Sequence, residues 1–433
     1  MLLSFSVENW RSFRDRATIS MIASAEKNFK DRTMKVSGRP VVRLLPTAAI
    51  FGGNASGKSN LVSAIASARK FIVGGNSKMD GQTGFDAPFR LDAECLEKPT
   101  RFSFVILIDI KEKFRVFEYS FGVTQTAVTE EKLIQSDFSG NQKVLFHREL
   151  LEGGKEKFEG ILSRNKRIQF VFAGTRRDAL FLKNAYFQNV AEIEPVIKWF
   201  SDSLHVISPE MKYCDENILK KQERLEEFAD ILDKYDTGIR GVTFEEAPPA
   251  AAGIASLMLE RNGFFNGPRR MDIFGHGEVI FASEKGGSIE LKELKTLRRA
   301  KDGKPVKFSF SDESDGTRRL VDIIPIYQSL AHDPGSVFIV DELDRRLHPN
   351  LIEGIMRDYL SDIDETSRSQ LIFTTHDANL MSQSTLRRDE IWLVDRAQDG
   401  ASELFSLMDF DARKDENIRR AYLVGRFGGI PRI

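Results

Sequence analysis

Two glycines, a lysine and a serine near the start of the chain are spaced to hold phosphate groups. Gly52 is followed by four residues and then by Gly57, Lys58 and Ser59. In such a loop the glycines let backbone N–H groups turn toward phosphate oxygens, and the helix that follows adds the positive end of its dipole. The lysine can reach the β and γ phosphates, and the serine hydroxyl can bind Mg²⁺. The predicted ligands are ATP and Mg²⁺, and the predicted ATP-binding residues of the loop are Gly52, Gly53, Asn54, Ala55, Ser56, Gly57, Lys58, Ser59 and Asn60.

The residues on either side of this loop favour the strand and the helix that it requires. Ala48 to Phe51 form a short apolar run, as a buried strand does, and apolar residues recur at helical spacing from Leu61 to Ile72. A glycine turn that matched the motif by chance would not have to lie between a buried strand and a helix. The sequence therefore predicts a loop that holds a nucleoside triphosphate.

Two later apolar strands end in residues that could complete the site. The run 336–340 leads into Asp341 and Glu342, and the run 371–375 leads into His376. A carboxylate at such a strand end can hold Mg²⁺ through water, the next one can polarise the attacking water, and a histidine can donate to the γ-phosphate. The alternatives are an acidic helix cap and a structural histidine. We predict that Ser59 and Asp341 bind the metal and that Glu342 and His376 are catalytic.

A fourth stretch, at 314–317, could bind an anion from a helix N-terminus. Ser314 and Gly316 precede Thr317 and an apolar helix expected over 320–330, so the turn offers a hydroxyl, free N–H groups and the helix dipole. The same residues are equally typical of an ordinary N-cap. Ser314, Gly316 and Thr317 are the remaining predicted ATP-binding residues.

Composition excludes several classes of protein. The 433 residues include 63 lysines and arginines against 64 aspartates and glutamates, so global charge does not indicate nucleic acid. Cys95 and Cys214 have no metal-ligand spacing and suggest no disulfide framework, which fits a reducing compartment. We expect no targeting segment, because residues at the N-terminus show neither a basic region followed by an apolar one nor a transit-peptide composition. No stretch approaches the ~20 apolar residues that cross a bilayer. We expect a cytoplasmic protein without a membrane partner.

Hydrophobic patterns divide the chain into three regions. Residues 2–8 and 17–22 alternate with period two, and four further strands are expected between 101 and 148. Helical spacing runs over 177–200, where Pro195 marks a break or restart, and again over 215–235. The predicted domains are an N-terminal lobe at 1–175, a helical insertion at 176–240 and a C-terminal lobe at 241–433.

Two of these segments have open interpretations. The helix at 215–235 has one apolar stripe and either packs on a neighbour or serves as a partner-binding arm. The stretch 292–307 holds seven basic residues and is either a solvated loop or a contact for a phosphate backbone.

Together the motifs resemble those of the ABC-type ATPases, in the branch that contains RecF, the SMC proteins and the OLD-family ATPases. The resemblance implies a Walker A motif at 52–59, a degenerate signature at 314–317 in which Asp315 replaces a glycine, and Walker B at 337–341. It also implies a catalytic glutamate at Glu342, a D-loop around Leu343 and Asp344, and a switch histidine at His376. No convincing Q-loop glutamine is found.

The implied fold is α/β: an ABC-type P-loop ATPase head with a parallel core sheet, an antiparallel β-subdomain and the helical insertion. In such heads the signature acts in trans, so a homo-oligomer with ATP sites shared between subunits is implied.

The opening Phe5–Phe13, the segment Asp341–Pro349 and the closing Gly425–Pro431 are similar to stand-alone ATPases of prokaryotic anti-phage systems such as PARIS, Rlo-type and Septu-type. The resemblance covers 1–150 and 305–433 and is loose between them.

Four functional classes compete. A transporter motor is disfavoured by the N-terminal strands and the insertion, and an OLD-type nuclease needs a TOPRIM domain, for which the 57 residues after His376 leave no room. A RecF/SMC-like repair ATPase that binds DNA itself stays open, with 292–307 as its best support. We favour an ATPase sensor that holds and releases a separately encoded effector, a TOPRIM or HNH nuclease, in response to DNA or a phage protein.

Overall fold

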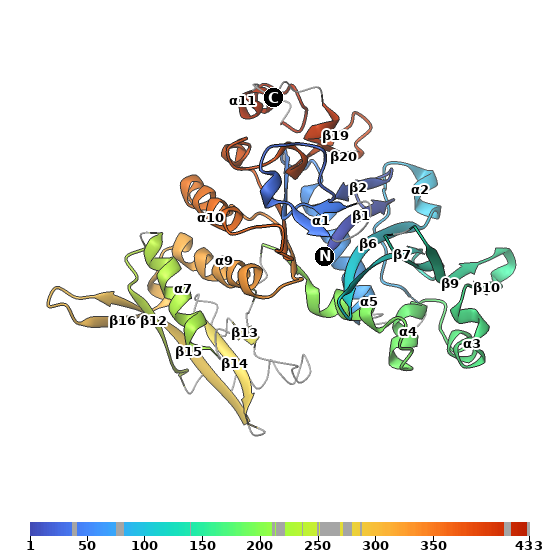
Figure 1. Ribbon diagram of the computed structural model, residues 1–433, viewed down its shortest axis with the longest axis horizontal. Coiled ribbons are helices and arrows are strands. Elements are labelled where there is room, and N and C mark those ends of the chain that lie inside the picture. The colour runs from blue at the N-terminus through green and yellow to red at the C-terminus, as the bar shows by residue number, and fades with distance from the viewer. Residues whose placement is uncertain are drawn as a thin grey trace. The chain divides into compact units, whose positions relative to one another are not determined.

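The computed structural model describes residues 1–36, 41–74, 82–138, 140–209, 213, 221–235, 237–248, 251, 269–271, 279–285, 288–410 and 417–430. The chain forms two compact units (Figure 1). Unit 1 comprises Met1–Pro209, Pro334–Leu343 and Met356–Ile433, and unit 2 comprises Glu210–Asp333 and Asp344–Ile355. The region 176–240, predicted as one insertion, is thus shared between the two units.

A six-stranded sheet in unit 1 carries the glycine-containing loop 52–59, the predicted phosphate-binding loop. Its order is β11 (Leu204–Ile207), β17 (Val337–Val340), β18 (Gln370–Thr374), β5 (Thr47–Gly52), β19 (Ile391–Arg396) and β20 (Ser402–Ser406). The first five strands are parallel, and β20 is antiparallel to β19. Every residue of β5, β17 and β18 is buried, which is typical of parallel strands covered on both faces.

A second, seven-stranded sheet in unit 1 is antiparallel throughout. Its order is β10 (Glu156–Glu159), β9 (Gln142–Leu150), β8 (Val128–Ser136), β7 (Lys113–Val123), β6 (Thr100–Ile110), β1 (Leu2–Glu8) and β2 (Ala17–Ser20). All of these strands except β10 were predicted, because turn residues bound each run and β-branched or aromatic residues fill it. The charged residues of β10 did not indicate a strand. The predicted α/β class with an antiparallel β-subdomain is confirmed.

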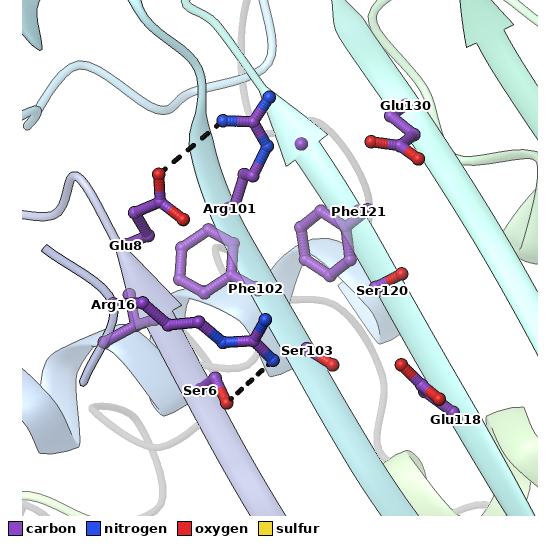
Figure 2. Close-up of a pocket in the computed structure, with 12 residues that line it drawn as sticks. Ser6, Glu8, Arg16, Arg101, Phe102, Ser103, Glu118, Ser120, Phe121 and Glu130 are labelled. Carbon is purple, nitrogen blue, oxygen red and sulfur yellow. Dashed lines mark hydrogen bonds and ion pairs between the residues drawn. The ribbon is translucent and has the colours of Figure 1, made fainter. Parts of the chain in front are cut away.

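One face of this antiparallel sheet is polar. A shallow hollow of about 160 Å³ lies over β1, β6, β7 and β8. Figure 2 shows Glu8, Arg101, Glu118 and Glu130 around it, with Arg101 and Glu8 paired at 3.7 Å. The opposite face contributes Phe104, Tyr119 and other buried rings to the main core of unit 1.

Helices of unit 1 cover these sheets. The long helix α1 (Lys58–Gly74) follows β5 and buries its apolar side in the main core. The predicted stretch 177–200 forms α4 (Phe181–Phe187), α5 (Glu194–Lys198) and the π-helical turn η4 (Trp199–Ser203). Pro195 lies in the first turn of α5, where its missing N–H costs no hydrogen bond, so it marks a restart.

Several further elements lie between these strands and helices or elsewhere in the described residues. They are α2 (Ala93–Glu97), α3 (Lys166–Ala173), α10 (Pro349–Ser361), α11 (Ile418–Leu423), the hairpin β3 (Met34–Val36) and β4 (Val42–Leu44), and the 3₁₀ turns η1 (Lys30–Arg32), η2 (Glu152–Gly154), η3 (Leu162–Arg164), η5 (Phe310–Asp312), η6 (Ala378–Leu380), η7 (Arg388–Glu390) and η8 (Leu407–Asp409). In the part of the chain that is described, no helix is long and apolar enough to span a bilayer.

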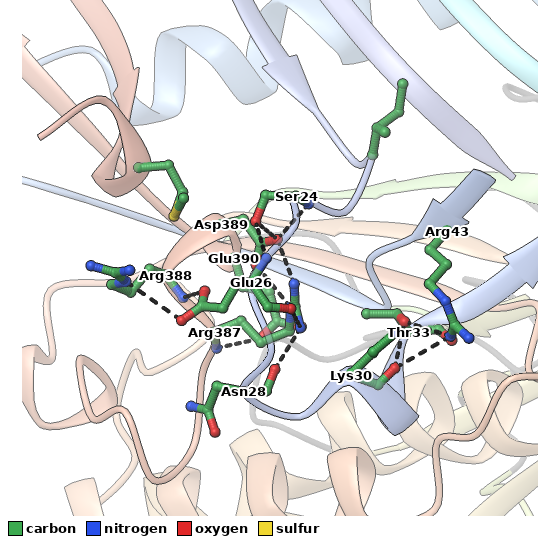
Figure 3. Close-up of polar contacts among 12 residues, drawn as sticks. Ser24, Glu26, Asn28, Lys30, Thr33, Arg43, Arg387, Arg388, Asp389 and Glu390 are labelled. Carbon is green, nitrogen blue, oxygen red and sulfur yellow. Dashed lines mark hydrogen bonds and ion pairs between the residues drawn. The ribbon is translucent and has the colours of Figure 1, made fainter. Parts of the chain in front are cut away.

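A buried polar network fixes the residues that directly precede β19 (Figure 3). The Arg387 guanidinium pairs with Asp389 at 2.7 Å and donates to the Asn28 carbonyl, while the Asp389 carboxylate accepts from the Ser24 hydroxyl at 2.7 Å. Burial raises the pKa of Glu390 to about 8. The network ties the N-terminal segment to the strand beside β5, and so positions the sheet around the loop.

The described residues of unit 2 include a five-stranded antiparallel sheet. The sheet order is β12 (Gly241–Glu246), β15 (Ser288–Arg299), β14 (Ile280–Lys285) and β13 (Arg269–Met271), with β16 (Pro305–Ser309) also paired to β15. Residues 292–299 are therefore strand, not the loop that their charge suggested. Cys214 lies outside the described residues.

The helix predicted over 215–235 is observed as α7 (Gln222–Lys234), and 214–220 lie outside the described residues. Its Phe228 and Leu232 are buried in one cluster with residues of the sheet and of α9 (Asp315–His332). This arrangement supports the interpretation of a helix packed on its neighbours rather than a free arm.

Candidate functional site

The carboxyl ends of three adjacent strands meet at one edge of the parallel sheet. β18 lies between β17 and β5, and all three strands run in the same direction. Residues that directly follow them must therefore lie near one another. These residues are the loop after Gly52, the pair Asp341 and Glu342, and His376. The structure therefore brings together those predicted site residues that lie in unit 1.

Lys58 connects the loop to the end of β18. Its side chain is buried, and its Nζ donates to the carbonyl oxygens of Gly52 at 2.7 Å and of Gly53 at 3.1 Å. The same Nζ lies 3.5 Å from Nδ1 of His376, which is an exposed residue. A cation from the start of α1 and an imidazole that follows β18 thus lie close together, where a phosphate oxygen could contact both.

The loop itself has the backbone that such a site needs. Ala55 and Gly57 both have positive φ, at 60° and 120°. A Cβ at Gly57 would lie 2.3 Å from the Ser402 hydroxyl and 2.9 Å from the Ser12 hydroxyl, so only glycine fits there. The Ser402 hydroxyl donates to the Ser56 carbonyl.

Ser12 and Ser402 were missed by sequence reasoning. Ser12 accepts from the Asn60 side chain at 2.8 Å, and its carbonyl accepts from the Ser402 amide at 2.7 Å. Ser12, in the connection between β1 and β2, and Ser402, at the start of β20, therefore both restrain the loop and the first turn of α1. Ser12 lay within a turn-like segment, whereas Ser402 had no local signal.

A buried threonine organises the acidic strand end. The Thr374 hydroxyl donates to Asp341 Oδ1 at 2.5 Å and accepts from the Glu342 amide at 2.7 Å. Asp341 is only 5% exposed. Glu342 has φ 51°, a left-handed conformation that costs a non-glycine residue about 1–3 kcal/mol and that its surroundings must enforce. Thr374, also missed from the sequence, supplies one such restraint.

The residues after β18 are held in a similar way. The Asp377 amide donates to Thr375 Oγ1 at 3.0 Å, and the Asp377 carboxylate caps η6 through the Asn379 amide at 2.9 Å. These two bonds fix the backbone on the far side of His376. The histidine is therefore positioned by an ordered turn rather than by an open loop.

The predicted signature residues lie in unit 2. Ser314 is the N-cap of α9, where its Oγ accepts from the Thr317 amide at 3.2 Å. The hydroxyls of Ser314 and Thr317 are 2.9 Å apart, and Asp315 pairs with Arg318 and, at 3.8 Å, with Arg346. The N-cap interpretation is thus correct, and contact of these residues with a nucleotide stays a prediction.

A hollow of about 280 Å³ adjoins the first half of the phosphate-binding loop. It is lined by Gly53, Asn54, Ser56, Ile430 and residues 395–398. Ile430 belongs to the closing segment 425–431, of which Pro431 lies outside the described residues. That segment is fixed by a bond of 2.9 Å from the Tyr422 hydroxyl to the Gly429 carbonyl.

Residues 48–382 match the family described as "AAA domain, putative AbiEii toxin, Type IV TA system". No curated protein matches the chain.

Three solved structures are similar in fold. An Smc head bound to the C-winged helix domain of ScpA is 14% identical, with 94% of this chain and 97% of that chain covered and a TM-score of 0.41. The SMC head domain from Thermotoga maritima is 14% identical, with coverage of 94% and 98% and a TM-score of 0.36. The Smc head with an extended coiled coil, bound to the C-terminal domain of ScpA derived from Pyrococcus furiosus, is 12% identical, with coverage of 98% of each chain and a TM-score of 0.38.

Proposed function

The chain belongs to this AAA domain family, and on that premise we propose that it binds and hydrolyses ATP to regulate a separately encoded effector. The observation that carries the ATPase assignment is the convergence of Lys58, His376 and the Thr374–Asp341–Glu342 network at one sheet edge. This convergence supports a site in which a positive charge, a carboxylate for the metal and a base would surround the γ-phosphate.

The residues present fit ATP and Mg²⁺. Mg²⁺ is usually held by one or two protein ligands together with substrate phosphates and water, and rarely by a dedicated protein cage. Accordingly, the described residues contain no cluster of three or more His, Cys, Asp or Glu that could hold a metal alone. Ser59 and Asp341 would hold Mg²⁺, which would neutralise phosphate charge. Glu342 would orient the attacking water and Lys58 would hold the phosphates.

The proposed ATP sites are composite. Ser314, Gly316 and Thr317 lie at the N-terminus of α9, where Ser314 caps the Thr317 amide and the positive end of the helix dipole suits an anion. In this proposal they contact the nucleotide held by another subunit, so that ATP binding promotes a homo-oligomer.

The proposed biological role is that of a sensor and scaffold in an anti-phage defence system. Its support is the family description, which mentions a toxin and a toxin–antitoxin system, and the resemblance of the motifs to defence ATPases. A nuclease or toxin would be held in one nucleotide state and released in another, through a differential affinity that typically amounts to about 1–3 kcal/mol.

Two variants test the ATPase assignment. Lys58→Ala should abolish ATP binding in calorimetric titration, because the phosphates lose their buried lysine. Glu342→Gln should retain binding but slow hydrolysis by about 100-fold or more, as expected for loss of a general base. Near-native affinity in the first variant, or native turnover in the second, would refute these roles.

The regulatory role is tested separately, by co-purifying the protein with the product of the neighbouring gene. We expect a stable complex whose mass or yield differs between the wild type and Glu342→Gln in the presence of ATP. If the two proteins never associate while ATP hydrolysis is normal, the effector proposal is wrong and the ATPase assignment stands.

A further inference from the structure

Helices α3 and α4 of unit 1 carry a concentrated positive charge. Residues 164–190 include six basic residues, Arg164, Lys166, Arg167, Arg176, Arg177 and Lys183, but only one acidic residue, Asp178. The chain as a whole has 63 basic and 64 acidic residues, so this segment departs sharply from the average. We call the exposed side of α3, α4 and their flanking residues the α3–α4 surface.

Most of this charge is not neutralised. Arg176 pairs with Asp178 at 2.7 Å. By contrast, Arg167 and Arg177 donate to the backbone carbonyls of Gln188 and Gly154, bonds that orient a guanidinium and leave its charge in place. Within the described ranges, no carboxylate forms an ion pair with any of the other five cations, namely Arg164, Lys166, Arg167, Arg177 and Lys183.

Two phenylalanines stand exposed among these cations. Phe170 on α3 is 80% exposed and Phe187 at the end of α4 is 65% exposed, although phenylalanine is normally buried. By contrast, Phe158 and Phe172 of the same region stack at 4.3 Å, and both contact the buried Phe181.

The two rings belong to one surface. Arg167 bonds across to Gln188, and Asn184 bonds back to the Val171 carbonyl at 3.0 Å, so the helices lie side by side and antiparallel (Figure 1). Phe170 on α3 and Phe187 at the end of α4 are therefore both exposed on two helices that lie next to each other.

Hydrogen bonds to buried charged residues fix the start of α4 within the α3–α4 surface. The buried Glu131 carboxylate accepts from the Phe181 amide at 2.6 Å and the Leu182 amide at 2.9 Å, at the start of α4. Buried Arg148 donates to the Ala179 carbonyl at 2.7 Å. A ligand would therefore meet a pre-organised surface, which lowers the entropy cost of binding.

We propose that the α3–α4 surface binds single-stranded nucleic acid. Unpaired bases would stack on Phe170 and Phe187, and the cations around the rings would contact phosphates. A duplex hides its base faces, so exposed phenylalanines favour a single strand. DNA and RNA share this chemistry, and the proposal applies to either.

The test is fluorescence anisotropy with labelled oligothymidylate and oligouridylate of about 16 nucleotides, the upper range of such sites. The wild type should bind one or both, and the variant Phe170→Ala/Phe187→Ala should bind at least tenfold more weakly. Both rings are exposed, so the variant should fold normally, which circular dichroism checks. Phe308→Ala, a partly exposed ring on β16 of unit 2, is the matched control and should bind like the wild type.

The charge contribution is measured from salt dependence. If Arg164, Lys166, Arg167 and Arg177 each contact a phosphate, log K should fall with log salt at a slope of about −2.8, because each contact to a single strand contributes about −0.7. Arg164→Gln/Lys166→Gln should halve that slope.

Three results would overturn the proposal. They are native affinity in the double phenylalanine variant, equal binding of a duplex of the same length, and binding of vesicles rich in phosphatidylserine without binding of either oligonucleotide.

Discussion

Replacing Thr374 with valine removes one hydroxyl from the centre of the acidic site without changing the volume of the side chain appreciably. In the native protein this hydroxyl serves two neighbours, as a donor to Asp341 at 2.5 Å and as an acceptor for the Glu342 amide at 2.7 Å. The residue is fully buried, so water cannot readily replace it. Valine therefore leaves one buried carboxylate oxygen and one amide without their partner.

The expected loss of stability follows from these two bonds. A hydrogen bond to a charged group contributes about 1.5–3 kcal/mol, and an orphaned buried donor costs about 1–3 kcal/mol. Since the backbone at Glu342 can relax partly, we expect Thr374→Val to lower the free energy of unfolding by about 2–5 kcal/mol. ATP hydrolysis should fall by about 10–100-fold, the usual effect of losing a group that orients a metal ligand.

The matched control is Thr47→Val on the adjacent strand. Thr47 is equally buried, but its hydroxyl makes a single neutral bond, of 2.8 Å, to the Leu371 carbonyl. It should cost about 1 kcal/mol and leave hydrolysis nearly unchanged. Thr374→Ser, which keeps the hydroxyl, should recover most of the activity.

Chemical denaturation and steady-state phosphate release at several Mg²⁺ concentrations measure both effects. If Thr374→Val hydrolyses ATP as fast as Thr47→Val, Thr374 does not organise the site.

Two further predictions concern assembly and pH. Subunits carrying Lys58→Ala and subunits carrying Ser314→Arg should each be inactive on their own. When they are mixed, ATPase activity should recover, because one interface then pairs an intact loop with an intact signature. If confirmed mixed oligomers recover no activity, the sites are not completed in trans. Burial raises the pKa of Glu390 from 4.5 to about 8. Between pH 4.5 and about 8 the folded state therefore binds more protons than the unfolded state. The free energy of unfolding should accordingly fall as the pH rises through this range. Glu390→Gln should flatten this decline in denaturant titrations at several pH values, and an unchanged slope would assign it to other groups.

The loop and the strand ends could be predicted because their signals are local. Gly52 to Ser59 specify a backbone path within a few residues, and the apolar runs before Asp341 and His376 identify buried strands. Parallel neighbours then place those strand ends at one edge. The prediction needed only the direction of the strands and no knowledge of side-chain contacts.

The partners of those residues could not be predicted, because their contacts join distant parts of the chain. Ser402 reaches the loop at Ser56 from 346 positions away, and Thr374 reaches Asp341 from 33 positions away. A serine or threonine at a strand end has many possible partners, and only the sheet order selects one. Ser402 and Thr374 therefore carried no local signal of these contacts, and the turn around Ser12 did not identify its partners.

The basic stretch at 292–307 shows how charge in the sequence differs from charge on a surface. In a strand, residues two apart share a face, so β15 places Lys292 beside Glu290 at 3.6 Å and Lys295 beside Glu293 at 2.5 Å.

Residues outside β15 neutralise further cations of this stretch. Arg298 pairs with Glu313, and Lys307 pairs with Glu245 of β12 at 2.5 Å. Such pairs contribute little stability at an exposed site, but they cancel the field that would attract a phosphate backbone. The stretch is thus weak support for a DNA-binding clamp. By contrast, among the described residues only Arg176 of the six cations around α3 and α4 forms an ion pair with a carboxylate. If unit 1 and not unit 2 meets nucleic acid, the contact lies on the unit that holds the ATP loop, and α4 belongs to the same core as α1. A trigger bound there could then act on the nucleotide site through the packing of a single compact unit.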